Sequence, residues 1–144
     1  MSKIGYSPSL PLDYDKDNGP YSMLNTLDGI IKQNLKMLLL TAPGERIMMP
    51  DYGVGLRNYL FMENTIVVKE DIESRILQQV DIFMPFLKNI NIDVKDSNST
   101  DSNAISVRVS FFVGPLGKEG YVELVLSPSI TSSGEIKSIL DQTI

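Results

Sequence analysis

The sequence predicts an α+β domain in which N-terminal helices pack on one face of a small antiparallel β-meander. Apolar residues in the first half of the 144-residue chain recur at helical spacing, and those after residue 89 alternate with polar residues, as in strands. Helices that come first and strands that come later favour helices grouped on one sheet face. The length suits a single domain with a core of its own.

Three segments organise the chain. Residues 1–24 are rich in proline and glycine, which predicts an extended N-terminal arm that either frays or docks. Residues 25–126 hold the main periodic segments and form the predicted domain. Residues 127–144 form a tail in which Ser132 and Glu135 fit the capping box of one short helix. Because a short lone helix is marginal in water, it should dock on the domain or on another chain.

The first predicted helix covers residues 25–40. Its aliphatic side chains form one broad stripe, and Asn25 or Thr26 can cap it. Pro43 and Gly44 then end it, because proline cannot continue a helix and glycine accepts a positive φ.

Two more helices are predicted before the strands. Residues 54–61 form a short one, and residues 69–83 form a longer one that ends before Pro85. The apolar residues 66–68 between them predict a brief link or an edge strand. The longer helix has a core face and an acidic first turn, where the helix dipole favours negative charge. The core face comprises Ile72, Ile76, Val80 and Phe83, and the acidic residues are Glu70, Asp71 and Glu73.

The meander is predicted from three segments of alternating apolar and polar residues, at 90–94, 105–113 and 121–126. The polar run 96–103 and the turn at 114–117 separate them. Consecutive strands joined by turns pair as antiparallel neighbours, so the three segments predict one small sheet.

The amino-acid composition excludes several classes of function. The chain has no cysteine and no histidine, which removes disulfides, thiolate nucleophiles, the commonest general base and the commonest metal ligand. We therefore expect neither a metal nor a cofactor. The net charge is −5, and residues 63–144 carry the whole excess, with twelve acids and seven bases. An acidic chain with scattered bases is a poor ligand for nucleic acid, so no nucleic-acid partner is expected.

The N-terminus has no apolar stretch of signal-peptide length. The longest aliphatic run, residues 37–40, is far shorter than the ~20 residues of a membrane-spanning helix. We therefore expect a protein that is made in a cytoplasm and has no membrane partner.

The run from Leu38 to Phe61 predicts a rigid corner between two helices. Its turns are Pro43-Gly44-Glu45-Arg46 and Pro50-Asp51-Tyr52-Gly53. Arg46 can make a forked bond to a carboxylate or to carbonyls, in the domain or in a partner. Glu45 and Asp51 are the paired carboxylates that a glycosidase would use, but a Glu45–Arg46 ion pair and an Asp51 helix cap are the simpler interpretation.

The junction between the last helix and the first strand also offers apolar side chains. Met84, Pro85, Phe86 and Leu87 follow one another there, and all four cannot face the core. We expect Phe86 or Leu87 to pack in the core and the rest of the junction to be exposed for a partner.

Three residues of the later strands depart from the alternation. Phe112 lies on the polar face of its strand, and Tyr121 and Val125 lie on the minority face of theirs. Such residues form ordinary cross-strand pairs, or they mark a face or edge that a partner covers.

One ordered pattern carries a family resemblance: Thr41-x-Pro43-Gly44-Glu45-Arg46, then Pro50-x-Tyr52-Gly53-x-x-Leu56-x-x-x-Leu60-Phe61. This pattern, with a helix before it and a helix and meander after it, resembles the baseplate wedge or sheath-initiator proteins of contractile injection machines. These machines include contractile phage tails, tailocins and the type VI secretion baseplate. The resemblance covers residues 25–126, and the order of its parts makes it specific.

The resemblance implies a structural protein of the virion tail baseplate, assembled in the host cytoplasm, without enzymatic turnover. Its implied partners are the tail sheath protein, other baseplate wedge subunits and tube-proximal baseplate proteins, with about six copies in each ring. It also implies a sheet with an open edge, formed by residues 105–113 and 121–126, that accepts strands from the first sheath ring.

One departure from the family pattern concerns the junction. Many members carry a Glu-Pro-Arg triplet there, which binds a wedge partner, whereas this chain has Met84-Pro85-Phe86. Any contact made here must therefore be apolar rather than ionic. Two alternatives remain: a type VI secretion or tailocin counterpart, and, more remotely, a carboxylate-based cell-wall glycosidase.

Overall fold

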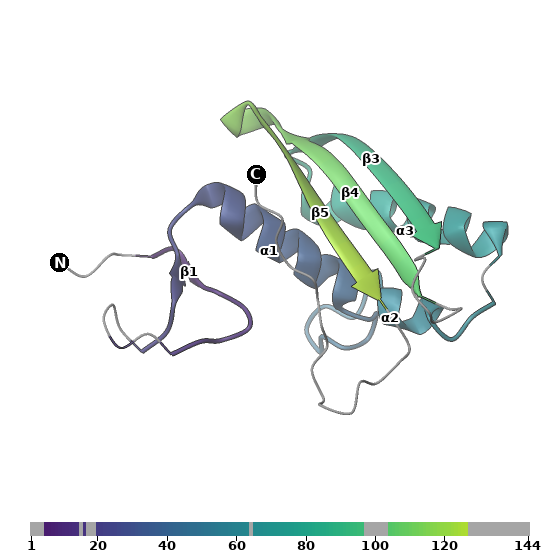
Figure 1. Cartoon of the computed structure of the whole chain (residues 1–144), viewed down its shortest axis with the longest axis horizontal. Coiled ribbons are helices and arrows are strands. Elements are labelled where there is room, and N and C mark those ends of the chain that lie inside the picture. The colour runs from purple at the N-terminus through teal and green to yellow at the C-terminus, as the bar shows by residue number, and fades with distance from the viewer. Residues whose placement is uncertain (1–4, 15, 17–19, 64, 97–103, 127–144) are drawn as a thin grey trace.

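The structure, a computed structural model, describes residues 5–14, 16, 20–63, 65–96 and 104–126. Within them a three-stranded antiparallel sheet lies over two longer helices, with a short helix near one end (Figure 1). The predicted α+β class is confirmed. The main elements are α1 (Leu27–Leu40), α2 (Leu56–Tyr59), α3 (Ile66–Phe83), β3 (Leu87–Asp96), β4 (Ile105–Val113) and β5 (Lys118–Leu126).

Helix α1 begins and ends near the predicted positions. The Thr26 side chain caps it by accepting a hydrogen bond from the Gly29 amide, at 3.3 Å. Its C-cap is Thr41, whose hydroxyl donates to the Met37 carbonyl at 2.7 Å. The aliphatic stripe is buried in the core, with Leu35, Leu38 and Leu39 at its centre.

Helix α2 is shorter than predicted, since only residues 56–59 are helical. Gly55 is its N-cap and has a left-handed backbone, with φ of 71°. That conformation favours glycine, so the chain enters the helix through a sharp bend and Val54 stays outside it.

Helix α3 is longer than predicted and corrects two expectations. Residues 66–68 are its first turn rather than a link or edge strand, because the Thr65 side chain caps the Val68 amide. The acidic residues Glu70, Asp71 and Glu73 therefore lie beyond the first turn. The core face is confirmed: Ile72, Ile76 and Val80 are fully buried, and Phe83 packs against the cluster.

The sheet has the order β3-β4-β5. β4 and β5 pair without interruption from Val113 opposite Lys118 to Ile105 opposite Leu126. β3 and β4 share a β-bulge between Lys88 and Asn91. The predicted strand at 90–94 is thus the middle of β3, and the one at 121–126 is the C-terminal part of β5.

One face of the sheet packs on the helices, and no helix of the described residues lies against the other face. Alternate residues of β4, from Ile105 to Val113, are buried, as the period of two predicts. α1 packs against β5 and α3 against β3. The two edge strands therefore lie over different helices, and the opposite face, the open face, carries the polar positions (Figure 1).

The described residues of the predicted N-terminal arm include two short strands and contacts with α1. β1 (Ser7–Pro8) pairs with β2 (Met23–Leu24) in a short antiparallel ladder beside α1 (Figure 1). Gln33 of α1 holds this arm through both ends of its amide. Its Oε1 accepts from the Leu10 amide at 2.9 Å, and its Nε2 donates to the Pro8 carbonyl at 3.1 Å.

Most of the predicted polar loop, at 97–103, and the predicted tail helix within 127–144 lie outside the described residues. No helix in the described part of the chain combines the length and apolarity needed to cross a membrane.

Candidate partner-binding surfaces

The corner at residues 41–55 is closed by backbone hydrogen bonds. The Gly44 amide donates to the Pro50 carbonyl at 2.7 Å, and the Val54 amide donates to the Leu38 carbonyl of α1 at 3.0 Å. Gly53 has φ of 111°, and a Cβ at this position would overlap the Thr41 carbonyl oxygen. Glycine is therefore required by both backbone conformation and space.

A buried amide from α3 completes the corner. Gln79 Oε1 accepts from the Gly53 amide at 2.8 Å, and Gln79 Nε2 donates to the Asp51 carbonyl at 3.0 Å. Both polar ends of this buried side chain are thus satisfied. The sequence analysis did not select Gln79, although a polar residue seven positions after Ile72 on a core face was a signal for it.

The charged residues of the corner do not act as predicted. Glu45 Oε2 accepts from the Ala42 amide at 2.8 Å, and the Arg46 guanidinium lies 3.8 Å from the centre of the Tyr52 ring. The expected Glu45–Arg46 ion pair is therefore wrong. The expected Asp51 helix cap is also wrong, because Gly55 occupies the N-cap of α2.

Tyr52 connects this corner to α3. Its ring meets the Phe83 ring edge to face, with centroids 4.9 Å apart. A groove of about 510 Å³ lies alongside, lined by corner residues Pro43 and Asp51 and by α3 residues that include Arg75 and Phe83. The Nε of Arg75 is buried and has no hydrogen-bond partner among the described residues.

A second polar link joins α2 to α3. The Tyr59 hydroxyl donates to Asp71 Oδ2 at 2.6 Å. Burial, followed by this hydrogen bond, raises the pKa of Tyr59 to about 12. The link holds the short helix in place and was not predicted from the sequence.

The helix–strand junction is divided between core and surface. Met84 and Leu87 are buried, whereas Pro85 and Phe86 are exposed. The choice of Met84 as a partner-binding residue is therefore wrong in the folded domain, because its side chain lies in the core. Of Phe86 and Leu87, one of which was expected in the core, Leu87 is the buried residue, and Pro85 and Phe86 lie on the surface of the junction.

The structure brings Phe112, Tyr121 and Val125 to the open face. Their register partners are Glu119, Ser110 and Ser106 respectively, and all lie at positions that alternate with the buried ones. Between them, Arg108 of β4 and Glu123 of β5 form a salt bridge of 2.8 Å. The face is therefore mixed, with apolar side chains on both sides of a charged pair.

The backbone direction of β5 follows from its turn. The Val113 carbonyl accepts from the Gly117 amide at 2.9 Å, so Val113 bonds toward the β5 side of β4. Successive residues of a strand bond to opposite sides, and the β4–β5 register is unbroken. The backbone groups of Glu119, Glu123 and Val125 therefore point away from β4, toward the outer edge of the sheet.

Exposed apolar residues outside the predicted site gather in two places. Ile47 and Met48 at the corner are each 93% exposed, and Phe61 after α2 is 86% exposed. Ile66 and Val67, at the start of α3, are also exposed. Side chains of this kind mark surfaces that partners cover. Their sequence signal was weak, because apolar residues next to turns are also common in cores.

A three-stranded antiparallel meander packed on two helices, with a glycine corner held by its own hydrogen bonds, defines a small α+β domain. The comparison with protein families assigns the class more narrowly. The family of baseplate wedge protein gp25 matches residues 25–114, which is more than half of the chain. The chain belongs to the gp25 baseplate wedge family, which is a family of structural baseplate proteins. No curated protein sequence matches the chain.

Three solved structures share the fold. A candidate tail lysozyme from Geobacter sulfurreducens is 16% identical with a TM-score of 0.64, covering 77% of this chain and 99% of its own. A chain of the type VI secretion system baseplate complex is 11% identical with a TM-score of 0.57, covering 70% and 93%. A chain of the anti-feeding prophage baseplate is 21% identical with a TM-score of 0.50, covering 87% and 86%. At these identities the likeness is one of fold.

Proposed function

We propose that this chain is a structural wedge subunit in the baseplate of a contractile phage tail and that it nucleates the sheath. In this role β5 offers its outer edge to a strand of the tail sheath protein in the first sheath ring. Other wedge subunits and tube-proximal baseplate proteins contact the remaining surface, including Arg46, Pro85 and Phe86. The role includes no catalytic turnover and needs no cofactor.

The geometry of β5 carries this proposal. Its nine residues pair with β4 without a bulge, and in the described part of the chain β4 is the strand that it pairs with. The outward backbone groups at Glu119, Glu123 and Val125 form a regular row that an added strand can extend. Membership of a baseplate wedge family supports the setting in which such a strand would arrive.

The neighbours support assembly in a ring. The anti-feeding prophage baseplate was symmetrised 6-fold, and its chain shares this fold. We therefore extend the proposal to six copies per ring in the present system. A type VI secretion or tailocin counterpart is the alternative setting, and it would use the same edge in the same way.

A proline at the outer edge tests the proposal. Val125→Pro removes an amide that points away from β4, so the fold should survive while strand addition fails. Purified sheath subunits are mixed with tube-bearing baseplates that carry either protein, and sheath length is scored by electron microscopy. We expect sheath on the unmodified baseplates and none, or only short stubs, on the variant.

Val125→Thr is the matched control, because it keeps the amide and the β-branched shape. It should support normal sheath growth. Sheath that grows equally on Val125→Pro baseplates, or on baseplates without this protein, would show that the edge of β5 does not template the sheath.

The glycosidase alternative gains no support from the corner. Glu45 accepts a hydrogen bond from the Ala42 amide, and of the two carboxylates only Asp51 lines the groove beside the corner. We expect purified protein and its Glu45→Gln variant to show the same absence of turnover on cell-wall glycan. Release of sugar by the first and not by the second would contradict the structural role.

A further inference from the structure

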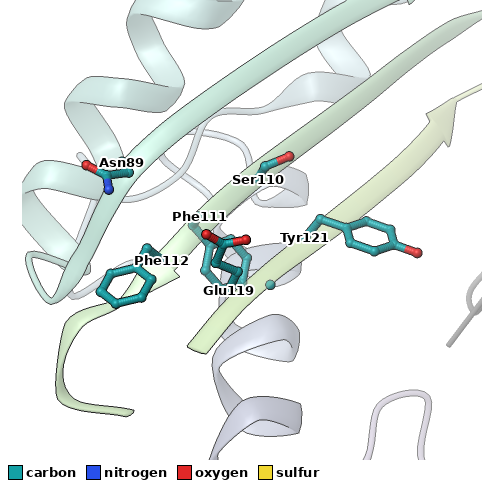
Figure 2. A pocket seen from close by; sticks show the side chains of 7 residues that line it. Asn89, Ser110, Phe111, Phe112, Glu119 and Tyr121 are labelled. Carbon is teal, nitrogen blue, oxygen red and sulfur yellow. The ribbon is translucent and has the colours of Figure 1, made fainter. Parts of the chain in front are cut away.

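A hollow of about 320 Å³ lies on the open face near the β4–β5 turn. Phe112 and Glu119 are register partners there, and so are Ser110 and Tyr121. Figure 2 shows the Glu119 side chain between Phe112 and Tyr121, which come from neighbouring strands. The hollow is thus lined by the aromatic residues Phe112 and Tyr121 and by the carboxylate of Glu119.

The floor and far rim of the hollow are also set by the fold. Phe111 and Gly120 lie opposite each other beneath it, and the Phe111 ring is buried on the helix side, so the pair offers backbone to the open face. Asn89 forms the rim on β3, where it has φ of 50° within the β-bulge. The bulge displaces β3 at this rim of the hollow.

The charge of the hollow favours a cation. Glu119 is the charged residue that lines it, and among the described residues this carboxylate makes no salt bridge. Lys88 lies opposite Phe112 on β3, so Phe112 separates this lysine from Glu119 in the register. Arg108 is paired with Glu123 and lies 5.8 Å from the Tyr121 ring, on the side away from Glu119 in the register.

We propose that this hollow receives an arginine side chain from the strand that adds to β5. A guanidinium stacks on aromatic rings and makes forked hydrogen bonds to a carboxylate, so it matches both features of the site. An added strand lies ~4.8 Å from β5, and the long arginine stem can reach across β5 from there. The inference rests on the proposed function, and it gives the first sheath strand a required residue near Glu119.

The first test uses a small probe and does not involve the sheath. The full chain, labelled with ¹⁵N, is titrated with N-acetylarginine amide and, separately, with the neutral isostere N-acetylcitrulline amide. We expect the arginine compound to shift the amide signals of Glu119, Gly120 and Tyr121 and the citrulline compound to leave them in place. Glu119→Gln should abolish the shifts. Equal shifts from both compounds, or none from either, would overturn the site.

The second test measures the affinity of the purified sheath subunit for this protein at two salt concentrations. Glu119→Gln keeps the shape of the side chain and removes its charge, so we expect binding to weaken about tenfold and to lose most of its salt dependence. Phe112→Leu keeps apolar volume and removes an aromatic ring, so it should weaken binding by about threefold. Glu70→Gln, on the exposed side of α3, is the control and should change neither value.

The two proposals fail in different ways. If Val125→Pro prevents sheath growth and Glu119→Gln leaves sheath affinity unchanged, the edge stands and the arginine site is wrong. If Val125→Pro has no effect while N-acetylarginine amide still binds at Glu119, sheath templating is wrong and the arginine cannot be assigned to a sheath strand.

Discussion

The corner and the outer strand β5 differ in how their polar groups are used. At the corner, Gly44, Gly53 and Val54 donate their amides to groups of the same chain, and Gln79 serves two of the corner residues. Along β5, one side of the backbone pairs with β4 and the other points to the outer edge. The polar groups of the corner therefore bond within the chain, whereas the outer edge of β5 pairs with no strand among the described residues.

This difference separates the residues that identify the family from those that can bind a partner. The pattern of prolines and glycines at the corner is the most recognisable part of the sequence, yet its bonds hold α1, the corner and α3 together. Strands β4 and β5, by contrast, have an ordinary sequence of alternating apolar and polar residues. A motif can thus mark a fold without being the site at which that fold works.

The strongest test of a self-contained corner is Gly53→Ala. The backbone there is left-handed and the added methyl group would overlap the Thr41 carbonyl, so we expect a loss of roughly 3–5 kcal/mol in the free energy of unfolding. Urea denaturation followed by circular dichroism measures it. Gly44→Ala, at φ of 85° in open space, should cost only about 1 kcal/mol. Equal losses at the two glycines would show that space at Gly53 is not limiting.

Removal of the buried side-chain amide of Gln79 should have the next largest effect on the free energy of unfolding. Gln79→Ala leaves the Gly53 amide and the Asp51 carbonyl without their partner, which should cost about 2–3 kcal/mol in urea denaturation. Gln78→Ala, one residue away and exposed, should change stability by less than about 0.5 kcal/mol. If Gln79→Ala and Gln78→Ala had the same small effect on stability, the turns of the corner would hold it without the Gln79 side chain.

Tyr59 offers a test that depends on pH. The pKa is raised to about 12 because burial and the bond to Asp71 favour the neutral phenol. This contribution to stability is complete below pH 10, falls as the pH rises from about 10 to about 12, and is gone above that. Tyr59→Phe should lower stability by about 1–2 kcal/mol at pH 7 and flatten the decline above pH 10. If the stability of Tyr59→Phe fell above pH 10 as steeply as that of the unmodified protein, the loss would come from groups other than Tyr59.

A change at Arg46 should have the smallest effect on stability. It also tests directly whether the corner, like β5, contacts a partner. Its guanidinium stacks on Tyr52 at an exposed position, so Arg46→Gln should cost only about 0.5–1 kcal/mol. Because Arg46 is also a proposed partner contact, the variant should enter baseplates at reduced yield, measured by quantitative immunoblotting of purified particles. Normal incorporation would show that Arg46 serves the corner alone.

Sequence reasoning succeeded where a period extended over many residues. The stripe of α1, the core face at Ile72, Ile76 and Val80, and the bounds of β4 were all predicted from spacing, and the structure has them. The errors lie where a local cap overrides the apolar pattern. Residues 66–68 look like a strand by composition, but Thr65 starts a helix there, and only Val68 of the three packs against the core.

The hollow on the open face was harder to predict than the helices, because its residues come together only through the pairing register of β4 and β5. Phe112 and Tyr121 were noticed as exceptions in their strands, but Glu119 was not, since only the pairing of β4 with β5 places it between them. The division at Met84, Pro85 and Phe86 likewise depends on how the chain turns after α3. Four adjacent apolar residues do not say which of them face inward.

The unbroken register between β4 and β5 has a mechanical consequence. A load applied along the length of β5 acts on all the cross-strand bonds of the ladder at once, whereas a load across the strand opens them one pair at a time from an end. The β3–β4 ladder shares a load less evenly, because its bulge interrupts the register. We therefore expect the domain to resist lengthwise pulling on β5 far better than peeling, which suits the sheath attachment proposed above.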